Sequence, residues 1–585
     1  MGLLQKALET YESHATYASQ NHENHAMMAP VGHIVTRAEL EITLDQDGHF
    51  VDAALVDKSE PKIIIPATEN SAGRTSAPCA HPLCEQIGYL IPQNEKKYQL
   101  YVDQLAAWEA SVYTHPKLTP ILHYVRGQTL LPDLLRCGLV TVNAKGLPEN
   151  EKQLIRWRIL GMDVDACWLD SSLFQAFTAY SIATHPGKQM LCMVSGEEAT
   201  AAGQHPKGII PINGNAKLIS ANDASGFTYR GRFTEEFQAA AIGYEASQKA
   251  HNALRWLAQE QGVIFGGRTF LCWNPQGRLI PQVHLPFAPP PKPIFRPSEY
   301  QDSLQEVLNS KKADLKLTDG VVLAVFDAAT TGRLSLTYYN EWQAHDFLER
   351  LHHWDTTCCW PHCFDGIRTP DLLQIVNCAF GTQRDQWLET DERVLRQQMQ
   401  RLIACRVNKS MIGGDLVQAL VHRASRPQAY DRHVWEKILF TACAVIRKYR
   451  MDRFKEEWNM ALEPERKDRS YQFGRLLAVM EKIERDTYNY NESREPNAMR
   501  LQSVFCQLPM KTACNIEAQL TKAYLPRLKP GTRIWYKNLI GEIMEIISQF
   551  PGEENKPLTD SYLLGYYLQR SALYTKKNEM EEHEA

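Results

Sequence analysis

The sequence has 585 residues, of which 44% are hydrophobic and 23% are charged, and its formal net charge is −4. This composition is typical of a globular protein, and the length suits two to four domains of about 150 residues each. A charge so close to zero excludes coating of nucleic acid by bulk electrostatics. A local basic groove stays possible, because affinity depends on the phosphates that are neutralised locally.

Features of export and membrane insertion are missing from the sequence. The N-terminus has no basic region followed by an apolar stretch, as a signal peptide would. The longest apolar runs, such as residues 321–326, suit a buried strand and fall far short of the ~20 residues that span a bilayer. The fourteen cysteines follow no regular spacing, which is typical of reduced, buried thiols. We therefore expect a cytoplasmic protein without membrane contact.

The first third of the chain combines helical and strand patterns. Apolar residues at helical spacing predict an amphipathic helix over residues 2–20. Residues 33–57 predict a hairpin around the turn Asp45–Gly48, because β-favouring residues flank it on both sides. Residues 67–78 read as a long polar loop without regular period, and residues 95–160 read mainly as helix.

A second mixed region runs from about 165 to 340. It contains a predicted helix over 234–259 and strands over 263–273 and 321–339. The proline run at 288–297 is the clearest internal linker.

From about residue 341 the pattern is almost wholly helical. The predicted fold class is thus α+β (mixed) for the N-terminal two-thirds, followed by an all-α C-terminal helical bundle. The expected domains are a mixed region at 1–340 with a sub-boundary near 160, a helical connecting region at 341–459, and the bundle at 460–585.

Common catalytic motifs for nucleotide binding, zinc proteolysis and serine hydrolysis are absent, and no cofactor is expected. Two features keep a metal-dependent nuclease open as an alternative. His345–Asp346 is a dipeptide used by phosphohydrolases, but it lies in a plain amphipathic helix. A histidine- and cysteine-rich segment offers zinc-ligand types but no separated second pair of ligands. Its members are His352, His353, Cys358, Cys359, His362 and Cys363.

Two polar segments carry side chains of the types that contact bases and phosphates. The candidates in the first polar segment, within residues 67–78, are Asn70, Ser71, Gly73, Arg74 and Thr75. Those in the second polar segment, which starts at residue 213, are Asn213, Asn215, Lys217, Arg230 and Arg232.

Basic residues are scattered through the C-terminal region and are densest between 500 and 540. Tyr524, Trp535 and Tyr536 interleave them there, a pattern that suits a groove for a single strand with rings for stacking on bases. A solvated helical face explains the same pattern equally well. The candidates are Arg466, Lys467, Arg475, Lys522, Arg527, Lys529, Arg533 and Lys537.

Read in order, these segments resemble the Csd1 family, the large subunit of the type I-C CRISPR effector complex (Cascade). The resemblance covers essentially the whole chain. Its most specific parts are the Ser-Gly-Glu to His-Pro stretch from Ser195 to Pro206 and the stretch from Tyr471 to Lys482. Further matches are the LLQKALETYE segment near the N-terminus and a short expected strand at 88–91.

The resemblance implies a subunit without catalytic activity that sits beside the subunit gripping the crRNA 5′ handle, at the end of a filament of backbone subunits on the crRNA. Its N-terminal region would inspect the protospacer-adjacent motif on target double-stranded DNA and help to open an R-loop. The helical tail would hold the displaced strand, and the assembled complex would recruit a separate helicase-nuclease. A structural scaffold that reads no DNA is the second alternative.

Met460 falls where the family's small-subunit segment begins. An internal start at this codon would yield a separate small helical subunit. We therefore expect one gene to give both products.

Overall fold

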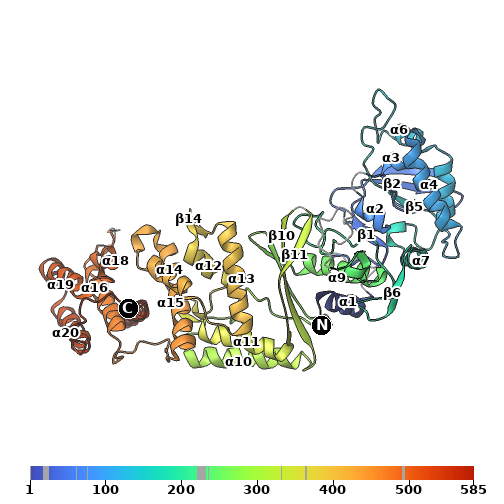
Figure 1. The fold of residues 1–585 in the computed structure, drawn as a ribbon. Helices are drawn as coiled ribbons and strands as arrows, with labels where there is room; N and C mark the ends of the chain where they lie inside the picture. Colours follow the sequence, from blue (N-terminus) through green and yellow to red (C-terminus); the bar gives the residue numbers. More distant parts are fainter. Residues whose placement is uncertain are drawn as a thin grey trace. The chain divides into compact units, whose positions relative to one another are not determined.

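The computed structural model describes residues 2–16, 26–60, 62–74, 77–220, 232–234, 236–330, 332–362, 365–489 and 494–584, with the backbone alone at 236–237, 329 and 575–584. The chain forms two compact units (Figure 1). The N-terminal unit comprises Met1–Ile280 and Gly320–Glu341, and the C-terminal unit comprises Pro281–Asp319 and Trp342–Ala585. The three domains expected from the sequence stay a prediction.

The N-terminal unit contains short helices and small sheets. Its helices are α1 (Leu3–Ser13), α2 (Glu69–Gly73), α3 (Ile87–Leu90), η1 (Pro92–Asn94), α4 (Glu95–Glu109), α5 (Leu118–Arg126), α6 (Leu130–Arg136), η2 (Cys167–Leu169), α7 (Ser171–Ala183), α8 (Glu236–Ala239) and α9 (Tyr244–Glu260). Its strands are β1 (His33–Thr36), β2 (Leu40–Leu44), β3 (Phe50–Leu55), β4 (Ile63–Pro66), β5 (Ile155–Ile159), β6 (Gln189–Leu191), β7 (Glu198–Thr200), β8 (Val263–Phe265), β9 (Arg268–Trp273), β10 (Gly320–Thr330) and β11 (Arg333–Gln343).

The C-terminal unit is mainly helical. Its helices are α10 (Pro297–Ala313), α11 (Ala344–Thr357), α12 (Leu372–Phe380), α13 (Glu392–Asn408), α14 (Gly414–Ala424), η3 (Pro427–Ala429), α15 (Arg432–Phe454), α16 (Arg469–Arg485), α17 (Asn497–Arg500), α18 (Gln502–Phe505), α19 (Pro509–Gln519), η4 (Leu520–Tyr524), η5 (Leu525–Arg527), α20 (Pro530–Ile547) and α21 (Ser561–Glu584). Its strands are β12 (Trp360–His362), β13 (Gly366–Arg368), β14 (Thr382–Arg384) and β15 (Trp387–Glu389).

The first hydrophobic core of the N-terminal unit lies on the sheet β3-β2-β5, in which β2 runs antiparallel to β3 and parallel to β5. The β2–β3 hairpin was predicted correctly. Residues 155–159 were predicted as helix, and this was wrong. Ile155, Trp157 and Ile159 are buried and alternate with two arginines, a period of two that belongs to a strand. Both arginines donate to the Glu41 carboxylate on β2, which anchors the strand at this register.

Four other local predictions were also wrong. The first polar segment contains a helix, α2, because Thr68 and Ser71 exchange side-chain and backbone hydrogen bonds in a capping box at its start. Residues 88–90 belong to helix α3, and only Ile91, which follows it, has an extended backbone. The helix expected over 234–259 is two helices, α8 and α9, and the N-terminal helix already ends at Ser13.

A second core in the N-terminal unit packs α1 and α9 against the antiparallel sheet β11-β10-β9-β8. Leu3, Ala7 and Leu254 from the helices meet Leu271 and Phe326 from the strands in this core. The predicted strands over 263–273 and 321–339 are therefore confirmed as the sheet that carries α9.

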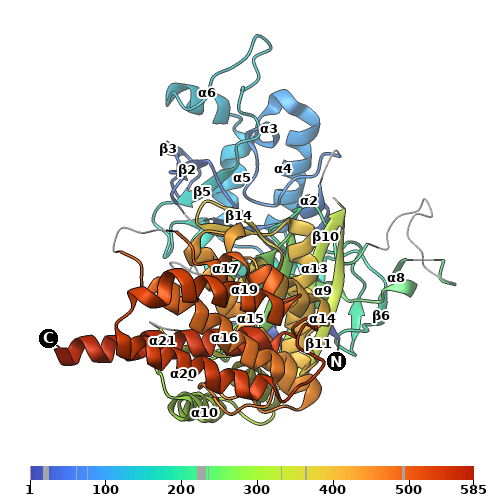
Figure 2. The same ribbon diagram turned by 90° about the vertical axis from the view of Figure 1, so that its left-hand side faces the viewer.

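The C-terminal unit is built on α16, which packs along α21, with α15 and α20 beside this pair (Figure 2). Gly474 and Gly565 face each other at the crossing, where a Cβ on either residue would collide with the other helix's backbone. The mixed α+β class with a helical C-terminal region is confirmed. The hairpins β12–β13 and β14–β15 interrupt the region that was predicted as almost wholly helical. None of the helices in the described ranges is long and apolar enough to cross a membrane.

Candidate nucleic-acid interface

In the first polar segment, Asn70 is exposed to solvent, whereas Ser71 and Arg74 form hydrogen bonds within the protein. Asn70 lies on α2 and is exposed. Ser71 is buried, caps α2, and its Oγ lies 2.9 Å from His81 Nδ1. Thr75 lies outside the described residues. Asn70 is therefore the side chain of this segment with the freest access to a ligand.

Arg74 is held within the protein. Its guanidinium donates to both oxygens of the buried Glu85 carboxylate, at 2.5 and 2.9 Å, and to the Cys79 carbonyl. It also lies over the Tyr89 ring. Burial disfavours the arginine's charge, but the Glu85 carboxylate outweighs burial and raises the pKa of Arg74. Arg74 thus holds the segment in place, and contact with DNA would compete with Glu85.

Three candidates of the second polar segment, Asn213, Asn215 and Lys217, lie on or next to a tight turn beside β11. Asn213 has a left-handed backbone (φ 56°), and its side chain donates to the Ala328 carbonyl. Asn215 is exposed. Lys217 forms backbone bridges to Lys207 and Arg333, which fix its position. Arg232 is exposed and lies over the Phe233 ring, and Arg230 lies outside the described residues.

The two polar segments, far apart in the sequence, meet at residues 203–207. One carboxylate oxygen of Glu69 accepts hydrogen bonds from the backbone N–H groups of Gly203 and Gln204. The Gln204 side chain donates to Asn70 Oδ1 at 3.1 Å and accepts from Lys217 Nζ at 3.3 Å. Gln204 was not predicted, although the His-Pro pair that follows it belongs to a stretch that the resemblance singles out.

Beside this meeting point lies a small cavity of about 50 Å³, lined by residues of the first polar segment, of the stretch 204–207 and of α9. His33 and His205 line it, and His251 stacks on His205. Burial lowers the pKa of His33 and His205 to about 4, and burial together with His205 lowers that of His251 to about 3. These rings are therefore neutral at neutral pH and act as hydrogen-bonding groups.

The C-terminal basic residues divide into exposed and internal ones. Arg475 is only 2% exposed and donates to Gln569, Gln472 and the Pro464 carbonyl. Arg466 pairs with Glu463 and stacks on Trp458, whereas Lys467 is exposed. The remaining candidates lie on or next to η4, η5 and α20, and in the described residues none has a carboxylate within ion-pair distance: Lys522, Arg527, Lys529, Arg533 and Lys537.

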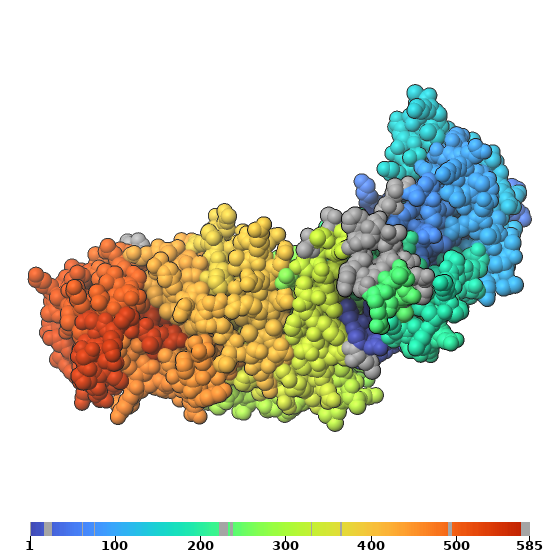
Figure 3. All heavy atoms as spheres, in the orientation of Figure 1, coloured from blue at the N-terminus to red at the C-terminus, as the bar shows by residue number. Residues whose placement is uncertain are grey.

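Two of the three aromatic rings expected to stack on bases are buried. Tyr536 is buried and donates to Asp486, and Tyr524 is buried and accepts from Arg494. Trp535 alone of the three exposes its ring, at 42%. Trp535 lies on α20, and the orange-red region of the chain that includes this helix forms one end of the C-terminal unit in Figure 3. This surface combines an exposed indole with unpaired positive charge, as single-strand binding requires.

A family model described as CRISPR-associated protein (Cas_Csd1) matches residues 10–574, nearly the whole chain. This chain belongs to the Cas_Csd1 family. The resemblance seen in the sequence is thereby confirmed at the level of the family. A comparison with curated proteins gives no match.

The dipeptide of the nuclease alternative is engaged in structural contacts in this Cas_Csd1 chain. His345 Nε2 faces the carbonyls of Lys312 and Leu315, at 3.1 and 3.2 Å, and Asp346 pairs with Arg350. Both side chains thus stabilise α11 and its neighbours. They do not converge on a common point with further ligands in the described ranges.

The histidine- and cysteine-rich segment does not gather a ligand set among its described members. Cys358 and Cys359 are buried, and burial raises the pKa values of their thiols to about 12 and about 11. His353 lies 3.5 Å from Asp452, and His362 lies 3.1 Å from Asp365. Cys363 lies outside the described residues. The described part of the segment therefore contributes to the core of the C-terminal unit.

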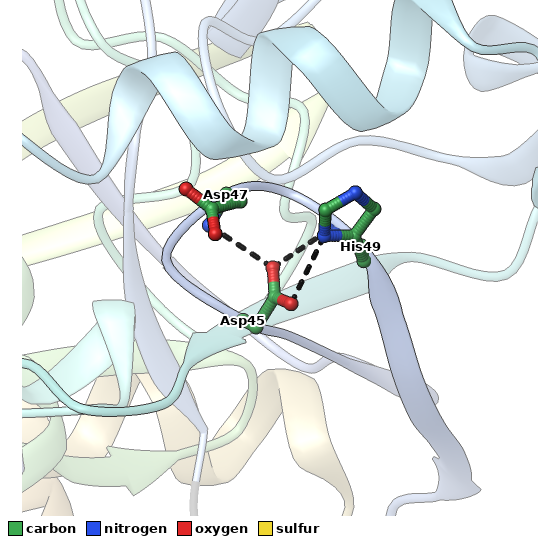
Figure 4. A group of neighbouring side chains, drawn as sticks. All are labelled: Asp45, Asp47 and His49. Atoms are coloured by element: carbon green, nitrogen blue, oxygen red, sulfur yellow. Dashed lines mark hydrogen bonds and ion pairs between the residues drawn. The ribbon is translucent and has the colours of Figure 1, made fainter.

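Asp45, Asp47 and His49 form the single group of three candidate metal ligands that the described residues bring together (Figure 4). The Asp45 carboxylate accepts from the backbone N–H groups of Asp47 and His49 and from the His49 ring. The His49 backbone bond is the main cause of a lowered Asp45 pKa. These bonds belong to the exposed β2–β3 turn, and they explain the group without a metal ion.

Met460 is buried, and its sulfur lies 3.6 Å from Cys359 Sγ. It precedes α16, so residues 460–585 contain α16 to α21. The contact with Cys359 shows that in the full-length chain the start of this segment is packed against β12 and its neighbours.

Proposed function

We propose that this Cas_Csd1 chain is the non-catalytic large subunit of a type I-C crRNA-guided Cascade complex. It acts in the cytoplasm without membrane contact, recognises the protospacer-adjacent motif on target double-stranded DNA, and helps to form the R-loop. One observation carries the proposal: Gln204 hydrogen-bonds both to Asn70 of the first polar segment, 134 residues away, and to Lys217 of the second polar segment, which joins the two segments in one surface. The protein would read this short motif, while crRNA pairing reads the target sequence.

The exposed basic surface of the C-terminal unit supports a second part of the role, holding the displaced strand. Lys522, Lys529 and Lys537 supply charge for phosphates without competing carboxylates, and Trp535 supplies a face for stacking. The buried Arg475 is omitted from this surface. The proposed partners are crRNA, the Cascade backbone subunits, the crRNA 5′-handle-binding subunit and a separate helicase-nuclease.

A small helical subunit from an internal start at Met460 completes the proposed set of partners. It would contain α16 to α21, in which α16 and α21 already form an extensive pair. If the small product persists after the Met460 codon is changed to one that cannot start translation, this part of the proposal is wrong.

The proposal that the subunit has no catalysis of its own rests on the engagement of His345 and Asp346 in local contacts. DNA degradation by the purified chain with divalent metals, lost in His345→Ala, would favour the nuclease alternative instead.

Motif recognition is tested in the assembled complex with DNA randomised beside the protospacer. Replacing Asn70 with alanine removes the exposed amide of α2, and loss of a base contact costs about 1–3 kcal/mol. We therefore expect weaker discrimination at one motif position and unchanged pairing to the crRNA. Binding that ignores the flanking sequence in the unaltered complex would favour a purely structural scaffold.

A further inference from the structure

Lys217 sets the direction of a chain of hydrogen bonds across the two polar segments. Its Nζ lies 3.3 Å from Gln204 Oε1, and Gln204 Nε2 lies 3.1 Å from Asn70 Oδ1. An ammonium group can only donate, so the oxygen of the Gln204 amide must face Lys217. The nitrogen of that amide then faces Asn70, whose oxygen must accept. A single lysine therefore fixes the orientation of both amides.

This direction leaves N–H donors at the surface. The Asn70 Nδ2 group has no acceptor among the described residues, and Asn70 is exposed. Gln204 Nε2 and Lys217 Nζ each keep donor capacity beyond the bond they make. The amide oxygens of Asn70 and Gln204 are both occupied inside the chain of bonds. The surface is thus rich in donors and poor in acceptors.

The surroundings hold this arrangement in place. Glu69 accepts from the Gly203 and Gln204 backbones and lies 3.3 Å from the His185 ring, which ties α2 to the 203–207 turn. Gly73 leaves room for the glutamine, since a Cβ there would lie 3.1 Å from Gln204 Oε1. A site assembled on such fixed contacts binds without first ordering its side chains.

We propose that Asn70, Gln204 and Lys217 form one donor array that recognises an acceptor-rich base-pair edge in the duplex beside the protospacer. This rests on the proposed function and adds Gln204 as a specificity-determining residue and Lys217 as the residue that positions both amides. Suitable edges are guanine N7 and O6 in the major groove, or adenine N3 and thymine O2 in the minor groove. Edges that present an amino group, as cytosine does in the major groove, fit poorly.

If the donor-to-acceptor direction of these hydrogen bonds is reversed, the preferred base-pair edge should change. In Gln204→Glu the carboxylate has no N–H to give, so Asn70 must turn its nitrogen inward and expose its oxygen. The array then offers an acceptor and favours edges with an amino group. Asn70→Asp, a change on the exposed surface of α2, exposes an acceptor in the same way. Lys217→Met removes the fixed direction and relaxes the preference, whereas Lys217→Arg retains a donor and retains the preference.

The test is binding of the assembled complex to DNA randomised beside the protospacer. For Gln204→Glu and Asn70→Asp we expect the preferred base at one position to change, with about a 5- to 150-fold loss on the original base. Gln305→Glu is the matched control, because Gln305 also donates to an asparagine oxygen, that of Asn309, on the exposed face of α10. It should leave the preference unaltered. Thermal unfolding of each variant checks that the fold is intact.

Modified bases identify the groove. Loss of binding with 7-deazaguanine assigns the contact to the major groove, and loss with 3-deazaadenine assigns it to the minor groove; either supports the array. If neither modification weakens binding, the proposal is wrong. If the unaltered complex discriminates motifs but Gln204→Glu, Asn70→Asp and Lys217→Met keep the same preference, the array is wrong and motif recognition stands. A complex without any motif preference would overturn both.

Discussion

At the scale of single residues, glycines decide how closely the two main helices of the C-terminal unit approach. A Cβ at residue 474 would overlap the Tyr562 carbonyl, and one at 565 would overlap that of Tyr471. We predict that Gly474→Ala lowers the free energy of unfolding of this unit by about 1–3 kcal/mol, because a packed interface must separate. Chemical denaturation measures the loss.

The control for this change is Gly541→Ala on α20, where a Cβ meets no atom within 4 Å. Alanine favours a helix over glycine by up to about 1 kcal/mol, so this variant should be as stable as the parent or more so. An equal change in the free energy of unfolding at both positions would show that close contact between α16 and α21 at Gly474 does not contribute to stability.

Arg74 illustrates what a sequence leaves open at this scale. Its residue type and polar surroundings in the first polar segment made it a candidate for contact with DNA. Its partner Glu85, eleven residues later, belongs to a turn before α3 that has no periodic pattern. The sequence therefore shows which side chains could contact DNA. The fold decides whether such a side chain faces a protein carboxylate or solvent.

At the scale of elements, α20 combines a buried face with an exposed basic one. Tyr536 and Ile543 are buried, while Trp535 and Lys537 lie in solvent. We predict that Trp535→Ala weakens retention of the displaced strand by about 1–3 kcal/mol, the usual value of one stacked base. Adding Lys537→Glu should also make binding less salt-dependent. Permanganate reactivity of the displaced strand in the assembled complex measures both effects.

Lys437→Glu on α15 is the charge-matched control, since Lys437 is exposed in the same unit but lies outside the basic surface. Loss of displaced-strand protection in this control, or none in the α20 variants, would contradict the assigned surface.

Elements with a strong period were predictable, and short or uneven ones were not. The β2–β3 hairpin and the β10–β11 strands follow clear patterns and were confirmed. Residues 155–159 were misassigned because five residues of alternation were read as part of a longer helical pattern. The meeting of the two polar segments depends on tertiary contacts, which no local period encodes.

At the scale of whole units, the N-terminal unit should lose stability in acid. His33, His81 and His251 are buried and His205 is partly buried, and burial is the main cause that lowers their pKa values to between about 3 and 4. Unfolded histidines titrate near 6.5, so between these values the unfolded state binds more protons. The unfolding temperature should therefore stay level above about pH 7 and fall as the pH drops through 6.5 towards 4.

The variant His33→Gln removes one of these groups and should make the fall with pH shallower. The unaltered protein, measured over the same pH range, is the control. A slope that His33→Gln does not change would show that this ring is protonated in the folded protein.

The central claim is that the Asn70 surface lies on duplex DNA beside the protospacer, and crosslinking tests it most directly. A photoreactive amino acid is placed at residue 70 of the assembled complex, with residue 309 on α10 as the control site, and the crosslinked nucleotides are mapped. We predict crosslinks from position 70 to the flanking base pairs and none from position 309. Crosslinks from position 70 to crRNA or to neighbouring subunits alone would contradict the account.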